Sequence, residues 1–298
     1  MRIFVTGASG FIGSAVVKEL IAAGHQVLGL CRSDEKAAAL TAAGAEVHRG
    51  SLDDLDSLKS GAAQSDGVIH LAFKHDFSNY VANCEDDRRA IKALGSVLAG
   101  SNRPLIVTSG TGMANTAPGQ LATEDKPMSR SQAIPRAASE EAAASVAADG
   151  VNVSVVRLPQ VHDTVRQGLV TIAIAVFRAK GVCAYIGDGR NRYPAGHVLD
   201  VARLYRLAFE KAERSANYHA VAEEGVAIRD IAETLGRRLN LPVKSIAPDE
   251  AADFFGWLAM FMGLDMPASS EQTRKKLGWR PTGPGLIADL EQLHVAEN

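Results

Sequence analysis

The residues Thr6-Gly7-Ala8-Ser9-Gly10-Phe11-Ile12-Gly13 are the strongest indication of the fold. They follow an apolar run at residues 3–5 and lead into residues 15–21, whose apolar positions have helical spacing. In such a strand–turn–helix, Gly7 permits a tight turn, Gly10 lets the backbone approach a pyrophosphate, and Gly13 lets helix and strand pack closely. The diphosphate charge then faces the amino end of the helix. We therefore predict a dinucleotide-binding site here rather than a purely structural turn.

Short apolar segments alternate with helical patterns over the first half of the chain. After the first strand, the predicted strands are residues 26–30, 46–48, 68–71, 105–108 and 153–156. Alternation of this kind is typical of a parallel sheet with helices on both faces. We therefore predict an α/β fold in which residues 1–158 form a Rossmann doubly wound parallel sheet that binds NAD(P).

The pattern changes after residue 159. Helical spacing and short strands follow one another without regular alternation, and a break falls at residues 264–267. We predict that residues 159–298 mainly form a smaller C-terminal α/β lobe that binds the substrate. Its predicted helices are residues 165–180, 201–211, 228–239, 251–263 and 270–277, and its predicted strands lie at residues 182–186 and near 218–221.

Several segments resemble the short-chain dehydrogenase/reductase superfamily, in its extended, epimerase/dehydratase-like branch. The residue sequence of the glycine loop matches that family. Residues 68–72, 105–109 and 155–159 look like its fourth, fifth and sixth strands. Residues 187–192 and 197–202 are similar to the segment that carries the chain around the substrate site. The resemblance covers nearly the whole chain, and it implies that residues 187–211 return to the core.

Composition gives no sign of a macromolecular partner. The chain has 298 residues and a formal net charge of -2, without a block of Lys and Arg, so we expect small-molecule ligands and neither nucleic acid nor membrane. The three cysteines are widely spaced, which supports neither a disulfide framework nor a zinc site. The first strand starts directly after Met1, and no apolar run reaches the roughly 20 residues that span a bilayer. We expect a cytoplasmic protein without a metal, and a homodimer is a further expectation.

The end of the second predicted strand bears on the choice of cofactor. NAD enzymes of this fold usually place an acid about 20 residues past the glycines, but Arg32 stands here. The guanidinium of Arg32 and the hydroxyl of Ser33 suit a 2′-phosphate, so we predict NADP. The alternative is NAD, with its ribose bound by Asp34. Asp53 resembles the family's aspartate that binds the adenine amine, although it could equally cap the following helix.

The residues predicted to bind the cofactor come from the glycine loop, the ends of three strands and one helix. They are Gly7, Ser9, Gly10, Phe11, Ile12, Gly13, Arg32, Ser33, Asp53, Leu71, Ala72 and Arg136.

The resemblance fails at the family's catalytic Tyr-x-x-x-Lys pair. No tyrosine lies between Tyr80 and Tyr185. Setting the family's downstream glutamate on Glu140 places Gln132 at the tyrosine position and Arg136 at the lysine position. Gln132 cannot titrate, and Arg136, with a pKa above about 12, can donate hydrogen bonds to the cofactor ribose but cannot serve as a proton donor. The chain therefore resembles atypical members of the family that lack this pair.

Other polar residues fall near the expected nicotinamide. Ser109 and Thr111 loosely match the family's catalytic Ser/Thr turn, so either could orient a carbonyl or simply cap its own turn. With Arg136 they form the predicted catalytic set. Candidate proton donors in loops on the ligand-binding side are His75, His162, Tyr193 and His197, each of which could equally be a packing or surface residue.

Two classes of function fit these observations. The first is an NAD(P)-dependent oxidoreductase or epimerase/dehydratase-like enzyme that acts on a small carbonyl or hydroxyl compound. Arg157 and Arg192 suggest an anionic or polar group on that substrate, unless they form structural ion pairs. The alternative is a non-catalytic NADP(H)-binding sensor or regulatory protein. We favour the enzyme, because a sensor has less need of the complete second lobe.

Overall fold

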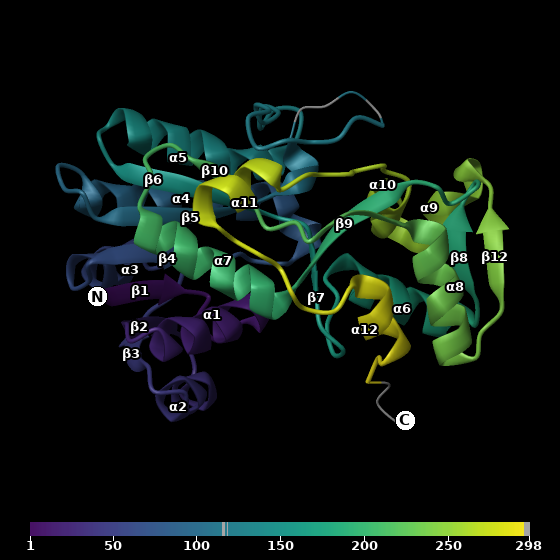
Figure 1. Ribbon diagram of the computed structural model, residues 1–298, viewed down its shortest axis with the longest axis horizontal. Helices are drawn as coiled ribbons and strands as arrows, with labels where there is room; N and C mark the ends of the chain where they lie inside the picture. Colours follow the sequence, from purple (N-terminus) through teal and green to yellow (C-terminus); the bar gives the residue numbers. More distant parts are fainter. Residues whose placement is uncertain (115–116, 118, 295–298) are drawn as a thin grey trace.

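The computed structural model describes residues 1–114, 117 and 119–294, and its centre is a seven-stranded sheet (Figure 1). The strand order is β10-β6-β5-β4-β1-β2-β3, and every neighbouring pair is parallel. This confirms the predicted doubly wound parallel sheet. The strands are β1 (Arg2–Thr6), β2 (Gln26–Cys31), β3 (Glu46–Arg49), β4 (Gly67–His70), β5 (Pro104–Gly110), β6 (Asn152–Leu158) and β10 (Asn217–His219).

Helices cover both faces of this sheet, because side chains along each strand alternate between two apolar cores. In β1, Ile3 and Val5 belong to the core beneath one set of helices, whereas Phe4 belongs to the other. The first set is α1 (Phe11–Ala22), α2 (Asp34–Ala42) and α7 (Val198–Lys211). The second is α3 (Leu55–Ala63), α4 (Tyr80–Leu98) and α5 (Ala138–Ala148) (Figure 1). Short 3-10 turns lie at η1 (Phe77–Asn79), η2 (Thr111–Met113) and η3 (Pro135–Ala137).

Most elements after β6 gather beside the carboxyl ends of the strands and share a separate apolar core (Figure 1). This second lobe contains two small sheets, β11-β9-β7 and β12-β8. Its strands are β7 (Gln160–His162), β8 (Cys183–Ile186), β9 (Arg192–His197), β11 (Glu223–Ala227) and β12 (Val243–Ile246). Its helices are α6 (Leu169–Lys180), α8 (Ile228–Leu239), η4 (Pro248–Glu250), α9 (Ala251–Phe255), η5 (Gly256–Leu258), α10 (Ala259–Met262) and α12 (Leu286–Glu291).

Three elements that follow residue 159 pack on or beside the central sheet instead. The strand predicted near residues 218–221 was expected in the smaller lobe, but β10 pairs with β6 as an edge strand of the main sheet. Helix α7 packs against α1, and α11 (Glu271–Leu277) packs against α7 and β10. The buried side chains of Tyr205, Phe209 and Tyr218 join the core beneath α1, which is why these segments return to the sheet.

Two predicted helices differ from those observed, and in each case a glycine explains the difference. Helix α6 begins at Leu169, after Gly168 with a φ of 55°, rather than at residue 165. The predicted helix at 251–263 is divided at Gly256, whose φ is 58°. These left-handed conformations interrupt a right-handed helix and favour glycine. Within the described residues, none of the helices has the length and apolar composition needed to cross a membrane.

Candidate functional site

A cleft of about 1500 Å³ runs along the carboxyl ends of the parallel strands, between the central sheet and the second lobe. Ligands of open α/β sheets bind at this edge. Small-molecule sites usually occupy about 300–1000 Å³, so this cleft has room for a dinucleotide and a second ligand. Most of the predicted site residues line it: Gly7, Ser9, Gly10, Phe11, Ile12, Gly13, Arg32, Asp53, Leu71, Ala72, Ser109, Thr111 and Arg136.

The glycine loop is shaped by close contacts with its own neighbours. Gly7 has a φ of 66°, and a Cβ there would lie 2.8 Å from the backbone nitrogen of Ala72. A Cβ on Gly13 would clash with the carbonyl oxygen of Gly7. Gly10 differs, because its backbone is extended (φ -79°) and a Cβ would lie 3.2 Å from the Gly7 oxygen. The missing side chain at position 10 therefore leaves the loop open toward the cleft.

The amino end of α1 is available to an anion. Gly10 is its N-cap residue, and among the described residues no side chain caps the helix there. Backbone N–H groups of a first helical turn lack acceptors within the helix, and together with the helix dipole they attract a phosphate. Ser9, Phe11 and Ile12 line the cleft at the same place. The loop and the helix end thus fit the pyrophosphate of a dinucleotide.

The cleft carries two cations where β2 ends. Arg32 is exposed along the cleft wall and, within the described part of the chain, forms no ion pair. Lys36, in the first turn of α2, also lines the cleft. Sequence reasoning missed Lys36, although its position four residues after Arg32 was a usable signal. Asp34, the acid of the NAD alternative, pairs with Arg49 and does not line the cleft.

Ser33 and Asp53, which were both predicted to bind the cofactor, have different surroundings. Ser33 does not line the cleft, and its hydroxyl caps α2 by accepting a hydrogen bond from the Lys36 backbone nitrogen at 3.4 Å. Asp53 lines the cleft and does not cap α3, because Asp54 performs that role. Lys74 forms ion pairs with Asp53 and with Asp86 of α4. Hydrogen bonds to these two carboxylates raise the pKa of Lys74.

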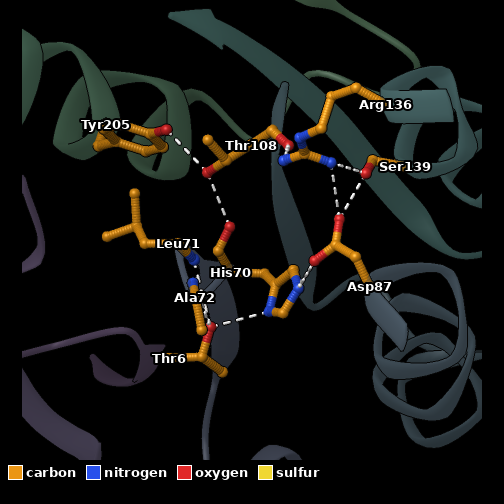
Figure 2. A network of polar contacts seen from close by, with 9 residues as sticks. All are labelled: Thr6, His70, Leu71, Ala72, Asp87, Thr108, Arg136, Ser139 and Tyr205. Atoms are coloured by element: carbon orange, nitrogen blue, oxygen red, sulfur yellow. Dashed lines mark hydrogen bonds and ion pairs between the residues drawn. The ribbon is translucent and has the colours of Figure 1, made fainter. Parts of the chain in front are cut away.

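A buried chain of polar groups lies beneath the middle of the cleft (Figure 2). The Thr6 hydroxyl accepts hydrogen bonds from the backbone nitrogens of Leu71 and Ala72, both at 3.2 Å, and lies 2.8 Å from His70 Nδ1. Because its single proton then points to Nδ1, we infer that His70 carries its own proton on Nε2. That Nε2 donates to Asp87 Oδ1 at 3.0 Å.

Arg136 completes this chain at the cleft surface (Figure 2). Its Nη1 lies 2.9 Å from Asp87 Oδ2, and its Nη2 donates to the backbone oxygen of Thr108 at 3.1 Å. Its guanidinium also lies 4.2 Å from the centre of the Phe73 ring. Burial raises the pKa of Asp87, but Arg136, with His70 and Ser139, outweighs burial and holds it at about 2. A charged Asp87 therefore fixes Arg136 in the floor of the cleft.

The two predicted hydroxyls at the end of β5 differ in what they can still bind. Thr111 Oγ1 donates to the backbone oxygen of Leu158 at 3.3 Å, so its hydroxyl is already used within the turn. The Ser109 hydroxyl is buried and has no hydrogen-bond partner among the described residues. A buried polar atom without a partner costs free energy unless a ligand or water satisfies it. Among the described residues, the Ser109 hydroxyl therefore stays unsatisfied in the lining of the cleft, whereas that of Thr111 does not.

Only some of the candidate proton donors lie at the cleft. His75 and Tyr193 line it, whereas His162 and His197 do not. His162 Nδ1 lies 2.6 Å from Asp289 Oδ2, and its ring packs edge-on against that of His197. His162 and His197 therefore pack within the second lobe beside Asp289, His197 Nε2 lying 3.9 Å from Asp289 Oδ2, which is the packing role that the sequence left open for them.

Three ionisable side chains that line the cleft, His75, Tyr193 and Tyr80, are uncharged near pH 7. Burial, together with the charge of Arg136, lowers the pKa of His75. Tyr193 is buried with its hydroxyl 3.9 Å from Met262 Sδ, and burial raises its pKa. Tyr80 also lines the cleft, and burial raises its pKa to about 12. Sequence reasoning did not include Tyr80 among the candidate donors.

Both predicted substrate-binding arginines form structural ion pairs. Arg157 is buried and binds Glu140 through two hydrogen bonds of 2.8 Å. Arg192 binds Asp265 in the same bidentate way, at 3.0 and 2.8 Å. Neither lines the cleft. These arginines therefore do not supply the predicted recognition of an anionic substrate group.

The segment aligned with the family's tyrosine lies outside the cleft wall. Gln132 is exposed in a turn and is not a lining residue. Pro135 occupies the first turn of η3, and α5 begins only at Ala138, so the helix starts after the position of Gln132. Arg136, four residues on, does reach the cleft.

A parallel sheet with an open glycine loop at the head of α1 defines a nucleotide-binding protein of the Rossmann type. The chain matches the NAD dependent epimerase/dehydratase family over residues 3–222. It is 49% identical to an uncharacterized protein of Schizosaccharomyces pombe, covering 97% of this chain and 98% of that one. It is 46% identical, with the same coverage, to an uncharacterized protein of Saccharomyces cerevisiae.

The fold also matches solved structures. One is DesIV, a dTDP-glucose 4,6-dehydratase from Streptomyces venezuelae with NAD and TYD bound, at a TM-score of 0.78 and 20% identity, covering 98% of this chain and 96% of that one. The chain belongs to the NAD dependent epimerase/dehydratase family. The resemblance to extended short-chain dehydrogenase/reductases is thereby confirmed. Membership supports an NAD-dependent oxidoreductase or epimerase/dehydratase-like function.

Proposed function

We propose that this protein is an NADP(H)-dependent oxidoreductase that acts on a small carbonyl or hydroxyl compound. One arrangement carries the proposal: a single cleft joins the open glycine loop, Arg32 and the Ser109 hydroxyl. Among the described residues, Arg32 has no ion pair and Ser109 Oγ has no hydrogen-bond partner. These two groups are therefore free to bind the 2′-phosphate at one end and a carbonyl oxygen at the other.

The roles of the other residues follow from their places along the cleft. The glycine loop and the amino end of α1 bind the pyrophosphate, with Ser9, Phe11 and Ile12 around it. Lys36 adds a second positive charge beside the 2′-phosphate, and Asp53 accepts from the adenine amine. Leu71 and Ala72 pack against the middle of the dinucleotide. In our proposal Ser33 only orders the first turn of α2, on which Lys36 lies.

The chemistry lies at the other end of the cleft. The bound cofactor supplies or accepts a hydride there. Arg136 donates hydrogen bonds to the ribose hydroxyls and does not move a proton. The Ser109 hydroxyl donates to the substrate oxygen and orients the carbonyl, while Thr111 holds the turn. His75 and Tyr193 are the two predicted donors that line the cleft, and one of them protonates that oxygen.

Calorimetric titration tests the cofactor site. Wild-type protein should bind NADPH, and Gly10→Val should abolish binding because its side chain fills the space of the pyrophosphate. The matched control is Gly263→Val, since Gly263 has a φ of -93° and lies outside the cleft. That variant should bind NADPH like the wild type. Tight binding by folded Gly10→Val would contradict the proposed site.

The sensor alternative shares the cofactor site and differs in chemistry. A sensor would bind NADPH and reduce no carbonyl compound. The position of Ser109 supports the enzyme, because its unpartnered hydroxyl belongs to a residue that lines the cleft near the end of β5, at the proposed substrate end. Three further expectations stay predictions: the division into residues 1–158 and 159–298, a homodimer, and a cytoplasmic location. The location is supported by Cys31, Cys84 and Cys183, which are buried and unpaired.

A further inference from the structure

The cleft beyond Ser109 is walled by large apolar side chains from both parts of the chain. Phe73, Phe77 and Tyr80 come from the segment that follows β4. Ile172, Trp257 and Phe261 come from α6, η5 and α10 of the second lobe. Two segments far apart in the sequence therefore build one apolar chamber.

Aromatic rings join the two walls of this chamber. The rings of Phe77 and Trp257 are stacked, with centroids 4.3 Å apart and an interplanar angle of 18°. Phe261 packs edge-on against Trp257 at 6.1 Å, and Tyr80 stacks on Phe77 at 5.6 Å. Trp257 nevertheless remains 44% exposed. Exposed aromatic surface inside a cleft is a binding surface for an apolar or aromatic ligand.

Positive charge is scarce at this end of the cleft. Lys74 lines the cleft beside Phe73 but is paired with Asp53 and Asp86. Two arginines also line this end among the described residues, and Asp87 neutralises one of them, Arg136. Arg166 is the other, and its guanidinium makes no hydrogen bond within the described chain. A nucleoside diphosphate carries at least two negative charges and many polar groups. Burying these without matching cations and donors would cost more than the aromatic contacts return.

We propose that the substrate is an uncharged aldehyde or ketone with an aromatic or alkyl body, rather than a sugar nucleotide. The body lies against Phe77, Trp257 and Phe261, and the carbonyl oxygen faces the Ser109 hydroxyl. Two electrons pass as hydride from NADPH to the carbonyl carbon, and the oxygen gains a proton that water replaces, giving an alcohol and NADP⁺. This inference rests on the proposed oxidoreductase function and names its substrate class.

Tryptophan fluorescence tests the chamber without turnover. The protein has two tryptophans, and Trp279 is 1% exposed whereas Trp257 borders the cleft. Hydrocinnamaldehyde is titrated into protein saturated with NADP⁺, which cannot deliver a hydride. We expect saturable quenching that Trp257→Phe removes. UDP-glucose, titrated in the same way, should cause no quenching and no calorimetric heat of binding.

Variants then locate the binding surface. Phe77→Ala should weaken hydrocinnamaldehyde binding about tenfold, because a large apolar contact is lost. The control is Met260→Ala, since Met260 is 62% exposed on α10 and does not line the cleft. It should stay within twofold of the wild type, and so should Arg166→Ala.

Three results would overturn this substrate class. They are tight binding of UDP-glucose without hydrocinnamaldehyde binding, an unchanged affinity in Phe77→Ala, and a tenfold loss in Arg166→Ala. Each of these leaves the proposed function intact if NADPH still binds the same preparation. Failure of wild-type protein to bind NADPH would instead overturn the proposed function, so the two failures are distinguishable.

Discussion

Among single residues, Arg32 and Ser109 mark the two ends of the cleft. Arg32 lies where β2 ends, and Ser109 lies near the end of β5, on the other side of the glycine loop. Neither side chain forms a polar contact with the described part of the protein that would compete with a ligand. Each can therefore be changed with little effect on folding and a direct effect on binding or turnover.

The first residue-scale prediction concerns cofactor choice. Arg32→Ala should remove most of the preference for NADPH over NADH, because it deletes a charge-assisted contact with the 2′-phosphate. Such a contact contributes about 2 kcal/mol, or roughly 30-fold in Kd. Calorimetric titration of both dinucleotides measures the preference. Arg190→Ala, which changes an arginine outside the cleft, should keep it. Equal wild-type affinities would show that Arg32 does not bind a phosphate.

The second residue-scale prediction concerns the Ser109 hydroxyl at the substrate end of the cleft. Ser109→Ala should lower kcat/KM for a reduced carbonyl compound by on the order of 10²-fold, because it removes a donor aimed at the reacting oxygen. Affinity for NADPH should be unchanged. Ser154→Ala is the matched control, since that hydroxyl is also buried without a partner in the described chain but lies outside the cleft. Equal kinetic losses in both variants would argue against a role of Ser109 in the site.

On the scale of elements, four of the side chains in Figure 2 join four elements together. His70 ends β4, Asp87 lies in α4, Arg136 lies in η3, and Thr6 ends β1. All four side chains are buried or nearly so, with Arg136 the most exposed at 13%. Breaking a buried ion pair leaves an unpaired buried charge. This lowers the free energy of unfolding far more than the loss of a surface ion pair does. The network therefore positions the cleft floor and stabilises the fold.

Acid stability tests this network. The pKa of Asp87 lies at about 2, below its usual value of 3.8, so its stabilisation is complete above pH 4 and is lost as the pH falls toward 2. That loss should amount to about 2 kcal/mol of unfolding free energy. Asp87→Asn should be destabilised by about 3–5 kcal/mol at neutral pH and should lack this acid-dependent part. Urea denaturation at several pH values measures both effects.

A surface pair provides the comparison for Asp87. Asp56 pairs with Lys59 on α3 and is 92% exposed. Asp56→Asn should change the unfolding free energy by less than about 0.5 kcal/mol at neutral pH. If Asp87→Asn were equally mild, the buried network would not stabilise the protein.

Local sequence patterns predicted the elements whose side chains are uniformly buried. Strands β4 and β5 are short, apolar and bounded by polar residues, so their pattern is clear. Strand β12 was missed because three of its four residues are exposed, and β9 was missed because it contains Pro194 and Gly196. Both resemble loops in sequence, and pairing with distant strands makes them strands.

On the scale of the whole molecule, the two lobes contribute different halves of one site. The glycine loop belongs to one local strand–turn–helix, so its glycine spacing together with the apolar strand before it and the helical pattern after it predicted it. The contact of Phe77 with Trp257 joins segments far apart in the chain, and no local pattern reports such a contact. The same limit explains why the sequence left two roles open for Arg157 and Arg192, since their partners, Glu140 and Asp265, are not their neighbours in the sequence.

Deuterium transfer tests the central claim, that the cleft performs NADPH-dependent reduction, most directly. The two diastereomers of NADPH deuterated at C4 are incubated separately with wild-type protein and hydrocinnamaldehyde, and the alcohol is examined by mass spectrometry. We predict that one diastereomer places a single deuterium on the carbinol carbon and the other places none. Alcohol without deuterium from either diastereomer, or no alcohol from a protein that binds NADPH tightly, would contradict the claim.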